Sequence, residues 1–226
     1  MERETGTITE ERERVQAVRR EEEKGMKGAR MAATGGSAGE AIGGAAAIVL
    51  GILGLIGVFP FILVSVATIA IGAALMLGGG SLAARFQAMA TAEGRVATTG
   101  GGMAMLVLSG LGGIVLGILA VLGLVTMTLV PIAIIAFGAS LALSGLSSAG
   151  ASMAYRGQQS FLAGEAEAAA SGTEVMVGLA GIVLGIIALA GLYPVILSLI
   201  SVLAIGGAIV MRATSVAGVM LGSVSR

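Results

Sequence analysis

The five residues Ile-Val-Leu-Gly-Ile occur three times in this chain, at positions 48–52, 114–118 and 182–186. The copies are 66 and then 68 residues apart, and the glycines around them keep the same register without a gap. Self-similarity at a nearly fixed period is the signature of a repeat architecture. The sequence therefore predicts one structural unit that is present three times.

The composition indicates whether water or lipid surrounds this unit. Of 226 residues, 56% are apolar and 12% are charged, and the mean hydropathy is +1.01. Soluble domains carry about 25% charged residues, so the composition predicts a chain that is embedded in lipid. A net charge of zero and only 3% aromatic residues argue against nucleic acid as a partner. The absence of Cys excludes disulfides and thiolate metal sites.

Six apolar segments contain no charged residue, and we expect each to form a transmembrane helix. The segments lie near 41–58, 61–77, 103–125, 127–143, 175–192 and 195–211. A helix of 17 or 18 residues spans about 26 Å, slightly less than the hydrocarbon core of about 30 Å. The predicted fold class is all-α: a polytopic membrane protein with six short transmembrane helices, arranged as three tandem helical hairpins after a charged N-terminal helix.

The remaining segments flank these hairpins. We expect a charged N-terminal helix or tail over 1–40, hairpin repeats over 41–77, 103–143 and 175–211, linkers over 78–102 and 144–174, and a C-terminal tail over 212–226. The tail is predicted to be helical from about Ile8 to Ala33, either as a solvated helix or as a docking helix for a partner. The linkers could be surface helices, continuations of the return helices or mobile segments, and glycines at both ends of the first linker favour a surface helix.

Tight turns join the two helices of the first and third repeats. A glycine ends the first helix and a proline begins the second, which are the usual places for these residues; they are Gly57, Pro60, Gly191 and Pro194. The middle repeat keeps Gly123 but has Thr126 in place of the proline, and Pro131 lies five residues deeper. Either its turn differs or its return helix kinks near Ile132, or Pro131 starts a shorter helix after a longer loop.

If every hairpin crosses the membrane and returns, both termini and both linkers lie on one side of the membrane. All thirteen Lys and Arg residues then lie on that side, which the positive-inside rule assigns to the cytoplasm. The predicted location is the inner (cytoplasmic) membrane, with both termini cytoplasmic.

A stripe of small residues, spaced three and four apart, follows one face of the first helix in each hairpin. The stripe consists of Gly44, Ala47, Gly51 and Gly54, of Gly110, Gly113, Gly117 and Ala120, and of Gly178, Gly181, Gly185 and Ala188. Small residues allow two helix backbones to approach closely in lipid. The partner could be the hairpin's own return helix, another repeat or another subunit, and we expect packing within the chain.

The apolar segments offer little chemistry. They contain hydroxyls such as Ser65, Thr68 and Ser140, but no acid, base or metal ligand beside them. We therefore expect no enzyme, no catalytic, cofactor or metal site, and no proton-coupled pump, because such pumps need ionisable residues inside the membrane.

The sequence from Gly185 to Pro194, followed by 203–206, is similar to the hairpin repeat of the HdeD-like acid-resistance membrane proteins. The sequence from Gly51 to Pro60, followed by Ile71 and Gly72, carries the same resemblance. The resemblance implies six helices arranged as three hairpins. It implies no functional residue.

Together, these features predict a non-catalytic membrane scaffold or subunit that self-associates or anchors a cytoplasmic partner through its N-terminal helix and linkers. Its other partners would be membrane lipid and either further copies in a homo-oligomer or the subunits of a membrane complex. In one alternative, copies enclose an apolar chamber or conduit for quinone or lipid. In the other, the hairpins cross only part of the bilayer and shape the membrane.

Overall fold

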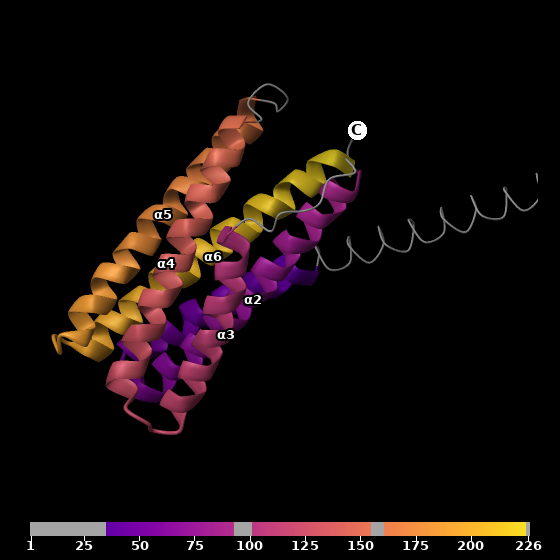
Figure 1. Ribbon diagram of the computed structural model, residues 1–226. Helices are drawn as coiled ribbons and strands as arrows, with labels where there is room; N and C mark the ends of the chain where they lie inside the picture. Colours follow the sequence, from indigo (N-terminus) through magenta and orange to yellow (C-terminus); the bar gives the residue numbers. More distant parts are fainter. Residues whose placement is uncertain (1–34, 93–100, 155–160, 225–226) are drawn as a thin grey trace, which may run out of the picture.

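The computed structural model describes residues 35–92, 101–154 and 161–224, and within these ranges the chain is all-α, as predicted (Figure 1). The helices are Gly35–Leu55, α2 (Pro60–Ala92), α3 (Gly101–Val121), α4 (Thr126–Ala154), α5 (Phe161–Leu189) and α6 (Pro194–Val224). The expected N-terminal helix over 8–33 lies outside the described residues.

Five of the six spans are longer than the apolar segments expected from the sequence, and the third is shorter, with 18 residues against 23. The parts that are long and apolar enough to cross a membrane are Gly35–Leu55, Pro60–Gly80, Ala104–Val121, Thr126–Ser147, Ser171–Leu189 and Pro194–Thr214. At 1.5 Å per residue, these 18–22 residues reach about 27–33 Å, which matches the hydrocarbon core. The expectation of short helices is therefore wrong for five of the spans, because these helices continue past the glycine, serine or charged residue that bounds the apolar segment.

The linkers begin as helix. Helix α2 passes through Gly78, Gly79 and Gly80 without a break, so the surface helix favoured for the first linker is wrong over this part. Helices α4 and α6 also continue beyond their membrane spans. The boundaries expected at 78, 144 and 212 thus fall inside helices, because Gly78, Ser144 and Arg212 stay helical where they contact neighbouring helices.

Turns of one shape close the three hairpins. The N–H of Gly57 donates to the carbonyl of Gly54, and the N–H of the next residue donates to the carbonyl of Leu53, each at 3.1 Å. This pair of bonds defines a Schellman motif, in which the residue after the helix adopts a left-handed conformation that suits glycine. The φ angles are 96° at Gly57, 82° at Gly123 and 89° at Gly191.

The middle hairpin turns in the same way, so the expectation of a different turn is wrong. Thr126 begins α4, and its hydroxyl donates to the carbonyl of Ala120 at 2.9 Å, which satisfies a carbonyl at the end of α3. Pro131 lies inside α4, so the interpretation in which it starts a shorter helix is also wrong.

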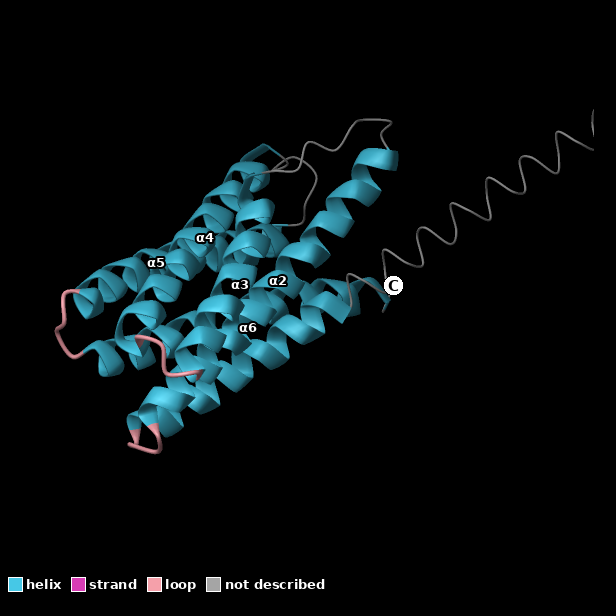
Figure 2. Ribbon diagram, turned by 60° about the horizontal axis from the view of Figure 1, so that its bottom comes forward, coloured by secondary structure: helices cyan, strands magenta, loops and turns pink. Residues whose placement is uncertain are grey.

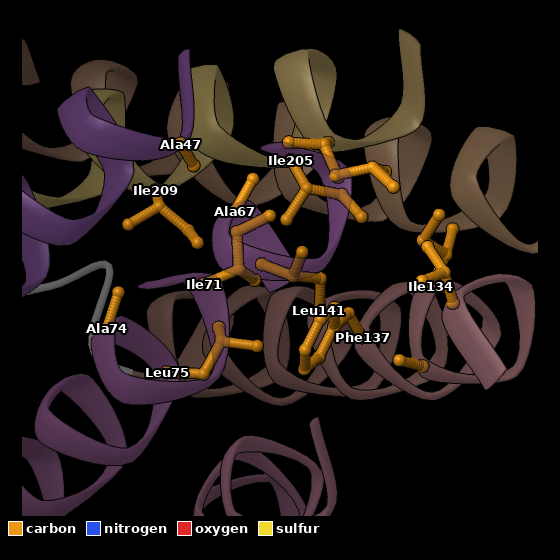
Figure 3. Close-up of a cluster of buried hydrophobic side chains, with 14 of the residues drawn as sticks. Ala47, Ala67, Ile71, Ala74, Leu75, Ile134, Phe137, Leu141, Ile205 and Ile209 are labelled. Carbon is orange, nitrogen blue, oxygen red and sulfur yellow. The ribbon is translucent and has the colours of Figure 1, made fainter. Parts of the chain in front are cut away.

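The return helices α2, α4 and α6 form an inner layer, and the first helix of each repeat lies outside it. Of the return-helix spans, 50, 61 and 44% are buried, against 28% of each outer span. Two layers of repeat-equivalent side chains fill the axis: Ile71, Phe137 and Ile205 in one, and Leu75, Leu141 and Ile209 in the next (Figure 3). The axis of the bundle is therefore packed with side chains.

The outer helices present apolar side chains to the surroundings. The valine and the second isoleucine of the Ile-Val-Leu-Gly-Ile repeat are exposed in all three copies, whereas its glycine is buried. A continuous exposed apolar surface is unfavourable in water and favourable in lipid. Each copy of the repeat thus directs its glycine to the bundle and its branched side chains to the membrane.

Neighbouring repeats meet along three lines that we call seams: α2 with α3 (first seam), α4 with α5 (second seam), and α6 with the helix Gly35–Leu55 (third seam). Two glycines cross at each seam: Gly72 and Gly110, Gly138 and Gly178, and Gly206 and Gly44. A Cβ atom on any of these six would lie 2.5–3.0 Å from the carbonyl oxygen of its partner glycine. Because any side chain would force the backbones apart, these crossings require glycine.

All twelve residues of the predicted small-residue stripe are buried. Besides the seams, they serve contacts inside a hairpin: Gly113 lies under Phe137, where a Cβ atom would come within 2.0 Å of the ring. Gly181 is less constrained, because its Cβ would lie 3.5 Å from Ile205. The partners of the stripe are thus the neighbouring repeat and the return helix of the same hairpin.

Replacement of Gly138 by Ala tests the second seam. The new Cβ would lie 2.5 Å from the carbonyl oxygen of Gly178 and 3.0 Å from the nitrogen of Ile182, so α4 and α5 would have to separate. We expect the free energy of unfolding in detergent to fall by about 1–3 kcal/mol. The control Gly207→Ala, whose Cβ meets nothing within 4 Å, should not lower it. Equal stability of the two variants would contradict the role of the crossing.

Candidate functional site: a buried ion cluster

Three charged side chains lie inside the described bundle: Glu40 in the helix Gly35–Leu55, Glu174 in α5 and Arg212 in α6. All three belong to spans that can cross a membrane. The apolar segments expected from the sequence stop one residue short of each of them. The expectation that the spans carry no ionisable residue is therefore wrong, and so is the argument against ion or proton chemistry that rested on it.

The three residues occupy one level of the repeat. In repeat register, Glu40, Leu106 and Glu174 are equivalent on the outer helices, and Gly78, Ser144 and Arg212 are equivalent on the return helices. The glycine crossings are the same in all three repeats, whereas this level differs in each one. We call Glu40, Ser144, Glu174 and Arg212 the ion cluster.

Arg212 is the centre of the ion cluster. Its Nε donates to Oε1 of Glu40 at 2.7 Å, and its Nη2 contacts the same oxygen. The Nε atom also lies 3.3 Å from Oε1 of Glu174, whose other carboxylate oxygen accepts from the Ser144 hydroxyl at 3.2 Å. The side chains are buried, with exposed fractions of 11% for Arg212, 4% for Glu40 and 6% for Glu174. The cluster therefore joins the first, second and third repeats inside the bundle.

Gly78 gives the ion pair its space. A Cβ atom at this position would lie 2.6 Å from Nη2 of Arg212 and 2.7 Å from the carboxylate carbon of Glu40. In the second and third repeats, the equivalent residues Ser144 and Arg212 fill this space with their own side chains. In the first repeat, the ion pair of Arg212 and Glu40 fills it.

The two carboxylates share the guanidinium unequally. Oε1 of Glu174 is buried and accepts no hydrogen bond from the described residues, although Arg212 lies beside it. Removing an ion from water costs several kcal/mol, and close pairing with further hydrogen bonds is needed to offset that cost. Arg212 is thus hydrogen-bonded to Glu40 at 2.7 Å and forms a longer ion pair with Glu174 at 3.3 Å.

Other polar side chains of the bundle are partnered within their own helices. Among the described residues, no group of three or more His, Cys, Asp or Glu side chains could hold a metal. Ser65, Thr68 and Ser140 donate to carbonyls three or four residues earlier in their own helices, at 2.7–2.9 Å. These hydroxyls satisfy their own hydrogen-bonding needs inside the bundle.

The sequence did contain a signal for the ion cluster. Glu40 and Glu174 each precede a crossing glycine by four residues, at Gly44 and Gly178, so they lie on the same buried face one turn earlier. Extending the repeat register by one residue at each end of the apolar segments would have included both glutamates and Arg212.

At the opposite end of the bundle, the beginnings of the three return helices surround a shallow apolar depression. Its lining includes the repeat-equivalent residues Val64, Val130 and Ser198, together with the turn residues Thr126 and Pro194. The lining contains no charged side chain. All ionic groups inside the described bundle are therefore at the end away from the turns.

Comparison of the chain with protein-family models, with curated proteins and with solved structures finds no match. The resemblance to the HdeD-like proteins therefore stays an expectation from the sequence. The helices themselves define the class: this is an integral membrane protein with six helical spans.

Replacement of Arg212 by Met tests whether the ion cluster stabilises the bundle. The substitution would leave two buried carboxylates without a counter-ion, and we expect the free energy of unfolding in detergent to fall by about 3–5 kcal/mol. Adding Glu40→Leu, which copies Leu106 at the equivalent position, should recover part of the loss. Wild-type stability of Arg212→Met would show that the cluster adds nothing to the fold.

Proposed function

We propose that the protein is a non-catalytic membrane anchor: a scaffold or subunit in the inner membrane that binds a cytoplasmic partner through its N-terminal tail and linkers. The observation that carries this proposal is the difference between the two ends of the bundle. One end has only short turns, and the other end bears everything that could reach a soluble partner.

At the turn end, the helices are joined by a few apolar residues, as Figure 2 shows for the three turns drawn in pink. At the other end, α2, α4 and α6 continue beyond their spans to Ala92, Ala154 and Val224. Of the thirteen Lys and Arg residues, Arg212 lies inside the bundle. The other twelve belong to the N-terminal tail, the linkers and the C-terminal segment. The positive-inside rule supports a cytoplasmic location for this end.

Anchoring is favoured over self-association because the small residues are used inside the chain. The three seams and the Gly113–Phe137 contact bury the whole predicted stripe. The exposed side chains of the outer helices are branched and long apolar residues, which suit contact with lipid.

The alternative roles have less support. Side chains fill the axis, so a chamber for quinone or lipid would have to lie between copies and not within one chain. Shaping of the membrane by shallow hairpins is disfavoured because each span is long enough to cross the hydrocarbon core.

Deletion of residues 1–33 separates anchoring from insertion. We expect the truncated chain to insert and fold but to lose its partner, while the full chain is retained in a larger particle. Native mass spectrometry in mild detergent measures this, because the chain alone has a mass of 22.1 kDa. Deletion of residues 1–7, which precede the expected helix, is the control and should retain the partner.

Two results of this measurement would contradict the anchor. One is a full-length chain that is purified alone at 22.1 kDa, and the other is retention of the partner by the truncated chain. Particles at multiples of the chain mass, without other components, would instead favour self-association or a chamber between copies.

Cysteine substitution at the turns tests the orientation, because the chain has no Cys of its own. We expect Phe59→Cys, Thr126→Cys and Tyr193→Cys to react with a membrane-impermeant maleimide added to intact cells, since Phe59 and Tyr193 are 74% and 73% exposed at the turns. Ala47→Cys, at a fully buried position, is the control and should not react. Labelling of the turns only after the cells are opened would indicate the opposite orientation, with the turns on the cytoplasmic side.

A further inference from the structure

The chain connects the two helices of the first and second seams directly, but it does not connect those of the third seam in this way. The first seam lies between helices α2 and α3, and the second between α4 and α5, so each pair is consecutive in the chain. The third seam joins α6 to the helix Gly35–Leu55, from opposite ends of the described chain. Only non-covalent contacts therefore hold the third seam closed.

At the level of the ion cluster, the polar contact between the two helices also differs from seam to seam. The first seam has Gly78 and Leu106 at the two equivalent positions, and neither is polar in its side chain. At the second seam the Ser144 hydroxyl lies 3.2 Å from Oε2 of Glu174 and 3.0 Å from the carbonyl oxygen of Leu141 in its own helix, so its one proton is shared between two acceptors. The third seam has the ion pair of Arg212 and Glu40, with Nε donating at 2.7 Å. The strongest polar contact thus lies at the seam that has no linker.

The third seam is also the least tightly packed crossing. The Cβ atoms that would clash at Gly44 and Gly206 lie 3.0 and 2.9 Å from the opposing carbonyl oxygen, against 2.5 Å for both glycines of the second seam. At the first seam the corresponding distances are 2.7 and 2.6 Å. At the glycine crossing itself, the two backbones are therefore least close at the third seam.

Arg212 has a second acceptor within its own hairpin. Glu174 belongs to α5, the partner of α6 in the third repeat, and its Oε1 lies 3.3 Å from Nε of Arg212 without accepting a hydrogen bond. A small movement of the guanidinium would exchange Glu40 for Glu174. The arginine would then stay paired, and only the glycine crossing and its neighbouring apolar contacts would hold the first helix.

We propose that Arg212 is a latch with two positions: paired with Glu40 it holds the third seam closed, and paired with Glu174 it allows the helix Gly35–Leu55 to move away from α6. An opening that left a buried arginine unpaired would be strongly unfavourable, and the second carboxylate removes that obstacle. Glu40 lies near the charged end of its span, so its carboxylate can extend towards water when released.

Spin-label distances across the third seam test the latch in the full chain. The labels are attached to Ile42→Cys and Met211→Cys, whose side chains are 70% and 63% exposed, in a protein that has no other Cys. The control pair is Leu108→Cys with Leu77→Cys, which are the repeat-equivalent positions at the first seam and are also exposed. Pulsed electron paramagnetic resonance in lipid nanodiscs gives the population of long distances for each pair.

The two glutamates should act in opposite directions. Glu40→Gln removes the closed partner, and we expect the long-distance population at the third seam to rise about tenfold, as loss of a charge-assisted hydrogen bond implies. Adding Glu174→Gln removes the open partner, and the population should then fall. An ordinary stabilising ion cluster predicts the reverse, because a second lost interaction would loosen the seam further.

The latch is overturned if Glu174→Gln raises or leaves unchanged the long-distance population in the Glu40→Gln background. It is also overturned if the control pair changes to the same extent. Should Glu40→Gln fail to fold, Ser144→Ala provides the test, since it keeps all three charges and frees Glu174 from a competing hydrogen bond. A rise in the long-distance population then supports the latch, and the absence of a rise counts against it.

Discussion

The close approach of glycine backbones at the three seams is the contact on which the rest of the structure depends. Lipid chains are as apolar as leucine, so burial of apolar surface does not hold transmembrane helices together. Van der Waals contact between backbones takes its place, and it requires residues without side chains at the crossings. Once the seams are set, the outer helices are held by one face, and the return helices fill the axis between them.

The second constraint is that polar groups in a membrane must find partners within the protein. Serine and threonine meet it locally by donating to carbonyls of their own helices. Arg212 and the two glutamates can only meet it across helices, so their ion pairs couple the first and third repeats, and Ser144 adds the second. The bundle therefore combines three equivalent apolar seams with one polar level at which the repeats differ.

Much of the fold could be predicted from the sequence, because the repeat, the turn glycines and the small-residue stripe are periodic patterns with a direct structural meaning. The ends of the helices could not, since Glu40, Glu174 and Arg212 stay helical through contacts made between distant segments. The sequence also left the start of α4 open, because the turn at Gly123 and the Thr126 hydroxyl fix it without a proline. The helix that packs against the small-residue stripe could not be predicted, because the small residues of each outer helix contact two neighbouring helices.

The third seam also has a consequence for synthesis in the cell. Membrane helices enter the bilayer in chain order, and the helix Gly35–Leu55 precedes all the other described spans, while its crossing partner α6 comes last. The glycine face of the helix Gly35–Leu55 therefore contacts lipid or another helix until α6 has been translated and inserted. Closure of the third seam is the final assembly event, so a ribosome that stalls before α6 leaves an intermediate in which Glu40 lies in the membrane without Arg212.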